Sequence, residues 1–485
     1  MPKKHSTAFV IFLFIFSITP NVISMYQEKV MFQTTNPNDW CTLSGYITDE
    51  YNNPINGVRV RISCGDEYLE NFSDSNGYYL IDHIPVVFCI WNISAYKKGF
   101  ETKWIDMPIS ENTTLDFKLS TIDIIYVDDD GGADYTKIQD AIDNSHDGGT
   151  IFVYSGDYIE NIFANKPIKI IGENKKTTKI ICGIDFDDKS NMIVITSNNV
   201  TIKNFTITNS YNISTEANGI GIFKSNDTII ENNIFNSTRF WWNSIYLNSS
   251  KFCKINDNII EGKYWLNEEE NDYNEFGISC INSENITINN NIIYYHYSTG
   301  IDICNSKNIN ISNNKIFENG YGINFWESTK SSIYKNQIQK GYMSSHIEAC
   351  RDIIINKNII SNNEACGLFI SNSNKIIIKE NNITSNEGEG IHFTGNIHLK
   401  ASIKYCYGNQ VLKNNFINNK KNAYFYTSYQ NKWDQNYWDD LKIKHYIIFG
   451  DIGPFPEVSR IKIPWINIDW HPAEEPYKIK NMYKY

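Results

Sequence analysis

The sequence has no cluster of Lys and Arg residues, and its 44 basic residues are outnumbered by 55 acidic ones. The formal net charge is therefore −11. Binding to a nucleic acid depends on concentrated Lys and Arg side chains that neutralise phosphates. The sequence thus predicts no nucleic-acid partner and favours an outer surface as the place of action.

Long hydrophobic runs are missing as well, apart from a short one at the amino terminus. Lys3 and Lys4 precede an eleven-residue apolar stretch, Ala8 to Ile18, and small residues follow near Ser24. This is the form of a signal peptide, and it is shorter than the about 20 residues that a membrane-spanning helix needs. We expect residues 1–24 to be a signal peptide and residues 25–39 a linker. The product is then secreted or held at the cell surface, with an uncleaved anchor as its one route to the membrane.

The ten cysteines show no CxxC spacing, which excludes a zinc ribbon or a thioredoxin-type motif as the sequence stands. Cys64 and Cys89 can form a disulfide in an oxidising compartment. Other cysteines, such as Cys280, fall on inward positions of the repeats described next, where a thiol acts as a small buried hydrophobe.

A short repeat dominates the rest of the chain. Apolar runs restart between Gly219 and Gly390, and from Gly277 successive starts lie 22 or 23 residues apart if Ser345 is counted as the weakest start. Each run leads to a polar turn, an alternating Ile stretch and an Asn-rich corner such as Asn232–Asn233. Alternation with a period of two indicates strands and excludes helical repeats. Units this short cannot bury a core alone, so neighbours must stack.

The corner Asn can adopt the left-handed conformation and lend its amide to the backbone of the next coil. This pattern resembles the right-handed parallel β-helix of the pectin-lyase-like superfamily, and specifically proteins with a NosD-type domain, over residues 121–435. The resemblance implies an all-β fold, a single-stranded solenoid. Trp433 to Asp440 and Trp465 to Pro472 follow, and we expect residues 436–485 to cap the last coil. Such tails resemble those of archaeal surface proteins of this type.

Residues 40–120 have a different pattern, in which Val58, Val60 and Ile62 alternate with polar residues. Turn sequences such as Asn53–Gly57 and Asp74–Gly77 separate the strands of a small β-sandwich. Together with Gly45–Asp49 and Ala95–Phe100, these segments resemble the carboxypeptidase regulatory-like, or prealbumin-like, domain. The resemblance implies a non-catalytic accessory used for spacing or surface attachment.

The β-helix begins near Ile124 with an acidic run, Asp128–Asp130, and a short amphipathic helix. Ile138, Ala141 and Ile142 share one face of this helix, and Asp134 is its predicted N-cap. Clustered oxygens can bind calcium, but the run lacks EF-hand spacing and its residues are also turn formers. No other cofactor is predicted.

One insertion, Lys263–Tyr273, lengthens a single repeat and is either a binding loop or an idle surface loop. Sequons for glycosylation begin at Asn71, Asn92, Asn112 and Asn226, although an Asn-rich repeat creates such motifs by composition.

Aligning the repeats on the first inward Ile predicts two columns of side chains. The inward ladder comprises Ile220, Ile245, Ile278, Ile301, Ile323, Ile347, Leu368 and Ile391. The outward column comprises Tyr246, Ser279, Asp302, Asn324, Glu348, Phe369 and His392. Coils stack ~4.8 Å apart, so Asp302 and Glu348 would have Cα atoms ~10 Å apart, near the range of a glycosidase carboxylate pair.

These columns carry the functional expectations. The first is binding of a polysaccharide or cell-envelope glycan, or a structural role in the envelope, through Tyr246, Asp302, Asn324, Glu348 and His392, with Trp326 nearby. The second is a polysaccharide lyase or glycoside hydrolase that acts on an acidic glycan and uses Asp302 and Glu348. The calcium, Arg and His-Gly motifs of pectin lyases and polygalacturonases are not intact here. The alternative to catalysis is a solvated polar face, because outward positions of any solenoid carry polar residues.

A third expectation follows from the NosD resemblance, which implies an accessory role in copper-site maturation. Copper handling needs Met, Cys or His side chains in proximity. The sequence has only seven Met, and its His residues are scattered along the repeats, among them His296, His346, His392, His398, His445 and His471. The residues themselves therefore do not indicate copper.

Overall fold

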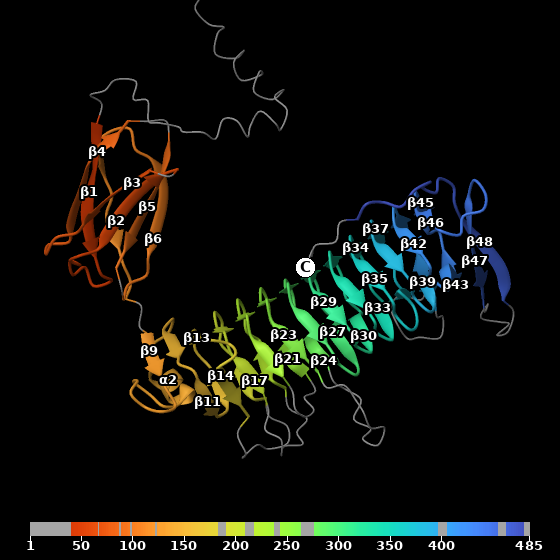
Figure 1. Cartoon of the computed structure of the whole chain (residues 1–485), viewed down its shortest axis with the longest axis horizontal. Coiled ribbons are helices and arrows are strands. Elements are labelled where there is room, and N and C mark those ends of the chain that lie inside the picture. Colours follow the sequence, from red (N-terminus) through yellow and green to blue (C-terminus); the bar gives the residue numbers. More distant parts are fainter. Residues whose placement is uncertain are drawn as a thin grey trace, which may run out of the picture. The chain divides into compact units, whose positions relative to one another are not determined.

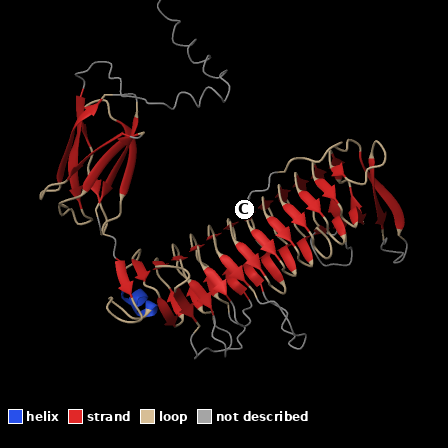
Figure 2. Cartoon of the chain, in the orientation of Figure 1, coloured by secondary structure: helices blue, strands red, loops and turns tan. Residues whose placement is uncertain are grey.

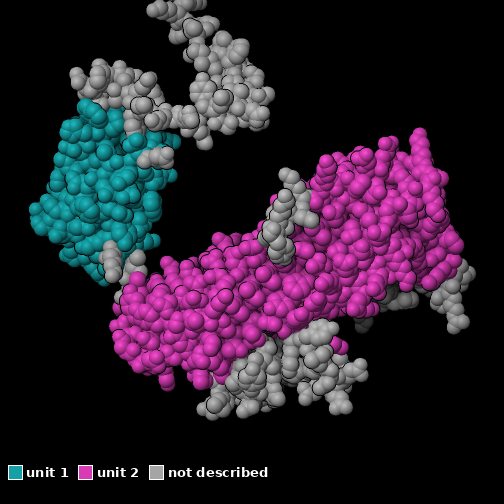
Figure 3. Space-filling model, in the orientation of Figure 1, with its two compact units in different colours: residues 1–123 teal, residues 124–485 magenta. Residues whose placement is uncertain are grey.

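The computed structural model describes residues 40–65, 67–86, 89–97, 99–121, 124–182, 191–208, 218–236, 243–262, 276–395, 405–453 and 462–479. The chain divides into two compact units, Met1–Asp123 and Ile124–Tyr485 (Figure 3). The predicted signal peptide, the linker and the insertion at Lys263–Tyr273 lie outside the described residues. Ordered structure in both units is almost entirely β (Figure 2). Within the described ranges, no helix has the length and apolar character to cross a membrane.

The first unit is a β-sandwich. Its strands are β1 (Trp40–Thr48), β2 (Arg59–Cys64), β3 (Glu67–Phe72), β4 (Tyr78–Pro85), β5 (Ile90–Tyr96), β6 (Lys103–Pro108), β7 (Thr113–Thr114) and β8 (Phe117–Lys118). One sheet has the order β4–β1–β7 with β8 also on β1, and the other has the order β3–β2–β5–β6. Leu43, Ile62 and Trp91 are buried between them. Cys64 and Cys89 form a disulfide, the pairing that the sequence predicts.

The second unit is a parallel β-helix in which each coil contributes one strand to each of three sheets (Figure 1). The first sheet contains β9 (Ile124–Val127), β10 (Thr150–Val153), β13 (Lys169–Gly172), β16 (Thr201–Lys203), β19 (Ile229–Glu231), β22 (Lys254–Asn256), β25 (Thr287–Asn289), β28 (Asn310–Ser312), β31 (Ser332–Tyr334), β34 (Ile354–Asn356), β37 (Ile377–Lys379), β41 (Gln410–Leu412) and β45 (Lys432–Asp434). The second contains β11 (Gly156–Ile159), β14 (Thr178–Ile181), β17 (Thr206–Thr208), β20 (Ile234–Asn236), β23 (Ile259–Glu261), β26 (Ile292–Tyr294), β29 (Lys315–Phe317), β32 (Gln337–Gln339), β35 (Ile359–Ser361), β38 (Asn382–Thr384), β42 (Asn415–Ile417) and β46 (Tyr437–Trp438).

The third sheet has the longest strands. It contains β12 (Ile162–Ala164), β15 (Ile193–Ile195), β18 (Ile220–Phe223), β21 (Asn243–Asn248), β24 (Phe276–Ile281), β27 (Thr299–Cys304), β30 (Tyr321–Trp326), β33 (Met343–Glu348), β36 (Leu368–Ser371), β39 (Glu389–Thr394), β43 (Lys421–Tyr426), β47 (Tyr446–Ile452) and β48 (Ile463–Asp469). A short pair, β40 (Cys406–Tyr407) with β44 (Ser428–Tyr429), lies beside the main sheets.

In most coils a glycine points inward as the second residue of a six-residue third-sheet strand, and Ser244, Ser344 and Asn422 take this place in β21, β33 and β43. A Cβ added at Gly277 would lie 2.5 Å from the carbonyl oxygen of Gly300, and one at Gly300 would lie 2.9 Å from that of Gly322. At these two coils, a larger side chain would therefore contact the backbone of the next coil. Since both this glycine and the following Ile point inward, the residue before the glycine lies on the outward side, and six-residue strands have three outward positions, some of which, such as Thr299, are nevertheless buried.

The inward ladder is correct except at one coil. Ile323 pairs with Ser345, and Ser345 pairs with Leu368, so the predicted member Ile347 belongs to the adjacent ladder between Phe325 and Ile370. That coil has Ser344 in place of the inward glycine and Ser345 in place of the first Ile. An alignment on Ile therefore slips by two residues, and since a strand has a period of two, Ile347 is still fully buried.

At the corner between the first and second sheets, two residues share the roles predicted for one Asn. One residue adopts the left-handed conformation, and the next supplies the side-chain hydrogen bonds. The left-handed position is occupied by Asn, Asp, Lys, Glu or Gln, as in Asn313, Lys335 and Glu380. The next residue is buried and is Asn in every coil of a continuous column. This column comprises Asn233, Asn258, Asn291, Asn314, Asn336, Asn358, Asn381, Asn414 and Asn436.

Both ends of the β-helix are covered. At the first coil, α2 (Ile138–Asn144) buries Ile138, Ala141 and Ile142, as predicted. Asp134 is not its cap. The Asp134 carboxylate accepts a hydrogen bond from the Tyr126 N–H instead.

At the last coil, Trp433 and Trp438 are buried. The rings of Trp438 and Tyr446 stack with centroids 3.9 Å apart. Trp465 and Trp470 are exposed, so the cap uses only part of the aromatic tail.

Candidate functional site

The outward face of the third sheet presents three parallel columns of side chains. The first column runs through Phe276, Thr299, Tyr321 and Met343, and later through Glu389 and Lys421. The second runs through Tyr246, Ser279, Asp302, Asn324, His346, Phe369, His392 and Tyr424. The third runs through Asn248, Ile281, Cys304, Trp326, Glu348, Ser371, Thr394 and Tyr426.

Five rings from successive coils form a continuous ladder on this face. Tyr321 stacks on His346 with centroids 6.0 Å apart. His346 and Phe369 are 5.2 Å apart, and Phe369 and His392 are 5.0 Å apart. The series ends with Tyr424, 5.0 Å from His392. We call these five residues the ring ladder. Each ring is partly exposed, so a ligand can reach its edge or face.

Carboxylates flank the ring ladder. The Glu348 carboxylate lies 3.4 Å from His346 Nε2, and burial raises the pKa of Glu348 while it lowers the pKa of His346. Burial favours the neutral form of each group. Further back, Asp302 Oδ1 accepts a hydrogen bond from Asn324 Nδ2 at 2.7 Å, and desolvation raises the pKa of Asp302 against this bond.

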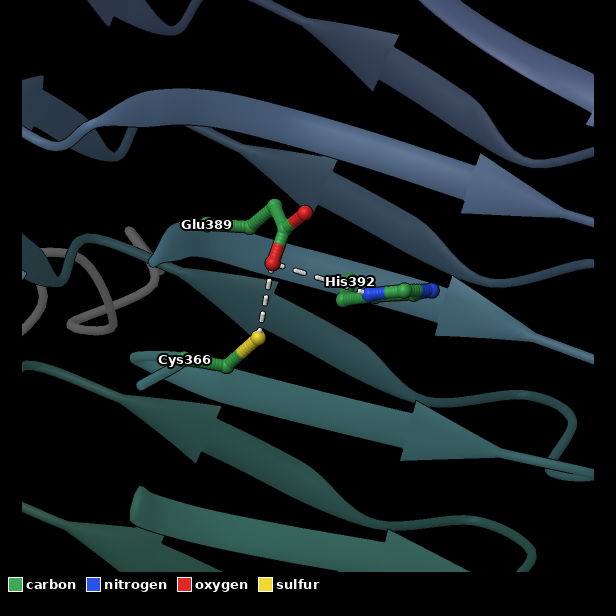
Figure 4. A group of neighbouring side chains, drawn as sticks. All are labelled: Cys366, Glu389 and His392. Atoms are coloured by element: carbon green, nitrogen blue, oxygen red, sulfur yellow. Dashed lines mark hydrogen bonds and ion pairs between the residues drawn. The ribbon is translucent and has the colours of Figure 1, made fainter. Parts of the chain in front are cut away.

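A tighter cluster joins two neighbouring coils at the other end of the ladder (Figure 4). The Cys366 thiol, in the turn before β36, donates a hydrogen bond to Glu389 Oε2 at 3.1 Å. His392 Nδ1 lies 3.8 Å from the same oxygen. The nearby imidazole of His392 lowers the pKa of Glu389 to about 2, whereas burial raises the pKa of Cys366 to about 12. We call these three residues the Cys–Glu–His cluster.

One cation stands beside this cluster. Lys421 of β43 lies beside Glu389 of β39 in the strand register. The Lys421 ammonium lies 3.9 Å from the ring centroid of Tyr424. Desolvation lowers the pKa of Lys421, although Glu389 and Asp451 oppose the change. The Tyr424 hydroxyl donates to Asp451 Oδ2 at 2.7 Å, and burial, reinforced by Asp451, raises its pKa to about 12.

Most of the predicted site residues lie on this face, but one is misplaced. Tyr246, Asp302, Asn324 and His392 share the second column as predicted. Glu348 does not, because the two-residue slip at Ser345 puts His346 in its place and moves Glu348 to the third column, beside Trp326. With this offset the Cα atoms of Asp302 and Glu348 are about 12 Å apart by strand and coil spacing rather than ~10 Å.

The residues that converge most closely on this face are not among those predicted from the sequence. They are Tyr321, Cys366, Glu389, Lys421 and Tyr424. All but Tyr424 lie next to the inward corner, where the alternation of sides is broken. A strict period of two assigns them to the wrong face. The spacing Glu389-x-x-His392, directly around an inward glycine, is the signal that would have revealed the cluster.

Two carboxylates of the acidic run at Asp128–Asp130 accept hydrogen bonds from backbone N–H groups. Asp128 Oδ1 accepts from the Asp130 N–H at 3.3 Å, and Asp129 Oδ2 accepts from the Asp157 N–H at 2.9 Å. Its carboxylates lie close enough to share an ion. Calcium binding there stays a prediction.

Comparisons with known proteins agree with the fold. A family model described as periplasmic copper-binding protein, NosD, matches residues 142–344 and 265–450, which together cover more than half of the chain. No curated protein matches the sequence.

Among solved structures, the chain is similar to the A-module of mannuronan C-5 epimerase AlgE6 from Azotobacter vinelandii, with 13% identity, 62% of this chain and 87% of that chain covered, and a TM-score of 0.48. It is also similar to a rhamnogalacturonan lyase (12% identity, 66% and 88% covered, TM-score 0.45). A third similar structure is PfbA, a surface adhesin of Streptococcus pneumoniae (14% identity, 70% and 95% covered, TM-score 0.38). These TM-scores are too low to transfer any activity to this chain.

Proposed function

We propose that this chain, which belongs to the NosD family of right-handed parallel β-helix proteins, binds a polysaccharide along the outward face of its third sheet. The ring ladder is the observation that carries the proposal. Aromatic rings offer apolar faces together with polar edges, which suits sugar rings. Successive rings are one coil apart, and the coil spacing of ~4.8 Å is close to the length of one sugar residue. A polymer lying along the ladder can therefore contact several coils in register.

The charge of the face indicates the class of polysaccharide. Among the described residues of this part of the sheet, the carboxyl groups of Glu348, Glu389 and Asp451 outnumber the ammonium groups of Lys421 and Lys462, the latter 5.2 Å from the Tyr426 ring centroid. A polyanion would meet like charges, which disfavours its approach. We propose a neutral polysaccharide as the ligand, and not an acidic one.

The place of action follows from two observations. The amino-terminal sequence has the form of a signal peptide, and the first unit contains the Cys64–Cys89 disulfide. Disulfides persist in oxidising compartments outside the cytoplasm. We propose that the protein is exported and that the first unit acts as a spacer or attachment domain.

Affinity electrophoresis against neutral and acidic polysaccharides tests the binding proposal. Phe369→Ala, at the centre of the ring ladder, should weaken binding about tenfold, because a base or sugar stacking on a ring contributes roughly 1–3 kcal/mol in comparable contacts. Phe163→Ala is a matched control, since Phe163 occupies the second column in the first coils and is exposed. Equal binding by both variants would overturn the proposal, as would retention of acidic polymers alone.

A second candidate is a lyase, and it is favoured by the group of Glu389, His392, Lys421 and Tyr424. The predicted carboxylate pair, Asp302 and Glu348, lies two coils apart in different columns, whereas these four residues lie in two adjacent coils. His392 could remove the proton next to a uronate carboxylate that Lys421 neutralises, and protonated Tyr424 could supply a proton to the leaving oxygen. Release of unsaturated uronate from an acidic polysaccharide, lost in Tyr424→Phe, would establish it. Absence of that product would exclude it.

Copper, which the family description implies, does not fit the described residues. The Cys–Glu–His cluster offers one thiol and one imidazole, fewer than the two His and one Cys of a blue-copper site. Its third donor is a carboxylate, a hard ligand that Cu(I) does not prefer. We therefore propose no copper-maturation step through this chain.

A further inference from the structure

Three ligating side chains of different chemistry converge at the Cys–Glu–His cluster. Cys366 Sγ, a Glu389 carboxylate oxygen and a His392 ring nitrogen all lie within 4.8 Å of one another. They come from two adjacent coils (Figure 4). The distances to Glu389 Oε2 are 3.1 Å from the thiol and 3.8 Å from Nδ1.

We propose that Cys366, Glu389 and His392 form a binding site for a single divalent transition-metal ion of the zinc class. Zinc accepts thiolate, imidazole and carboxylate ligands together, at about 2.3, 2.0–2.1 and 2.0–2.2 Å. In a tetrahedral site those bonds place neighbouring donors roughly 3.4–3.6 Å apart. The two measured separations lie within about half an ångström of that range, so rotamer adjustments suffice. Three protein ligands leave the fourth position open to solvent.

The backbone around the cluster fixes its donors in place. The Cys366 carbonyl accepts from the Ser344 N–H, and the Glu389 carbonyl accepts from the Gly367 N–H at 2.9 Å. The first bond joins the turn before β36 to β33, and the second joins it to the start of β39. Phe369 and Tyr424 contact the His392 ring from the neighbouring coils. Such supporting contacts orient a ligand and are often needed for tight binding.

The site is open enough for an ion to enter. The side chains of His392 and Glu389 are 19% and 30% exposed. Binding replaces the Sγ–H bond of Cys366 with an Sγ–metal bond, and the proton passes to solvent. His392 binds through Nδ1 with its remaining proton on Nε2. No change of oxidation state is involved.

The positive charge of Lys421 disfavours binding of a cation at the cluster. Its ammonium acts on the Glu389 carboxylate, whose charge it partly neutralises. Removing this ammonium removes a like-charge repulsion from the bound cation. The arrangement therefore predicts a site of moderate affinity that tightens when Lys421 is replaced.

The experiment is a Co²⁺ titration of the full chain after treatment with a chelator and a thiol reductant. We expect one equivalent to bind and to produce a near-ultraviolet sulfur-to-cobalt charge-transfer band that Zn²⁺ then abolishes. Cys366→Ser should lose this band, and His392→Ala and Glu389→Gln should weaken binding at least about tenfold. Lys421→Gln should tighten it. Cys304→Ser is the control, because Cys304 lies on the same outward face without an imidazole and should leave the titration unchanged.

A second measurement needs no variant. Zn²⁺ should slow alkylation of Cys366 in the wild-type chain while leaving alkylation of Cys304 unchanged, as read by mass spectrometry of peptides. A charge-transfer band retained in Cys366→Ser, or equal alkylation of Cys366 with and without Zn²⁺, would overturn the proposal. Neither measurement contains a polysaccharide. Phe369→Ala should lose glycan binding and keep the metal band, which distinguishes failure of this site from failure of the proposed function.

Discussion

A break in alternation at the second residue of the third-sheet strands brings side chains to the candidate site, and in most coils that residue is an inward glycine. Gly277, Gly300 and Gly390 turn toward the core, where a Cβ would meet the backbone of the next coil. The residue before each glycine is thereby turned outward. Because Gly390 and Ile391 both point inward, Glu389 lies on the same side of the sheet as His392. Chemistry on the face thus depends on residues whose own role is only close packing.

At the same scale, Ile323→Asp tests the inward ladder. Ile323 is fully buried between Ile301 and Ser345, so an Asp there would be a buried charge without a partner. We expect a loss of several kcal/mol in the free energy of unfolding, of order 3–5 kcal/mol. Urea denaturation measures it. Lys254→Asp, at an exposed strand position, is the control, and equal stability of the two variants would contradict the ladder.

Glu160 gives a prediction of pH dependence. Its carboxylate accepts hydrogen bonds from the N–H groups of Ile138 and Gln139 at 2.8 and 2.9 Å, and so caps α2. Burial nevertheless raises the pKa of Glu160 above its usual 4.5, against these bonds. A raised folded pKa gives stability that is complete below about 4.5 and is lost as the pH rises through the folded value.

The variant Glu160→Gln removes this titration. The free energy of unfolding of the variant should therefore increase relative to that of the wild type as the pH rises from about 4 to about 7. Thermal or urea unfolding at a series of pH values measures the difference. A difference that stays constant, or that changes in the opposite direction, would contradict the burial of the Glu160 charge.

At the scale of elements, the buried Asn column joins the first and second sheets across every coil from Asn233 to Asn436. In Asn314, Nδ2 donates to the Ile288 carbonyl and to Asn336 Oδ1, both at 2.9 Å, while Oδ1 accepts from the Asn291 N–H at 2.8 Å. The column ends at Asp469, whose carboxylate accepts from Asn436. Each corner is therefore satisfied by the coil before it and the coil after it.

We predict that Asn314→Ala destabilises the second unit by about 2–4 kcal/mol, because it leaves buried donors and acceptors without partners. Chemical denaturation of the full chain measures the loss. Asn310→Ala is the control, since the Asn310 amide is exposed and accepts only from the Ser332 hydroxyl. A loss below about 1 kcal/mol for Asn314→Ala would show that the column is dispensable.

At the scale of the whole molecule, the chain consists of two units with separate cores. The first buries Leu43, Ile62 and Trp91, and the second buries one continuous ladder of Ile and aromatic residues. Only the first unit has a disulfide among the described cysteines. Stability should therefore be divided between the units, each with its own transition.

Removing the disulfide tests this division. Cys64→Ser with Cys89→Ser should lower the stability of the first unit by about 3 kcal/mol, because a cross-link over a loop of this size restricts the unfolded chain. Calorimetry of the full chain should show one transition moved to lower temperature and the other unchanged. Residues 40–121 expressed alone should give the transition that moves. A single transition that shifts as a whole would contradict separable folding.

The sequence by itself determined the coiled architecture of this protein, its repeat length and every member of the buried Ile ladder but one, and it indicated that Cys64 and Cys89 can form a disulfide. These features can be read from local periodicity, because equivalent positions of successive coils have the same environment and therefore carry the same residue types. Register at Ser345 could not be read, since a slip of two residues leaves the pattern of inward and outward positions unchanged.

Only the tertiary structure decided the candidate site. Cys366 and Glu389 are 23 residues apart in the sequence and meet because adjacent coils stack in parallel register. Tyr424 joins them from a third coil. A Cβ added at Gly390, next to Glu389, would lie 2.7 Å from the Asn422 carbonyl oxygen of the following coil, and this close approach exists only once the coils are stacked. Convergence of side chains from different coils is a property of the stack, and no single repeat encodes it.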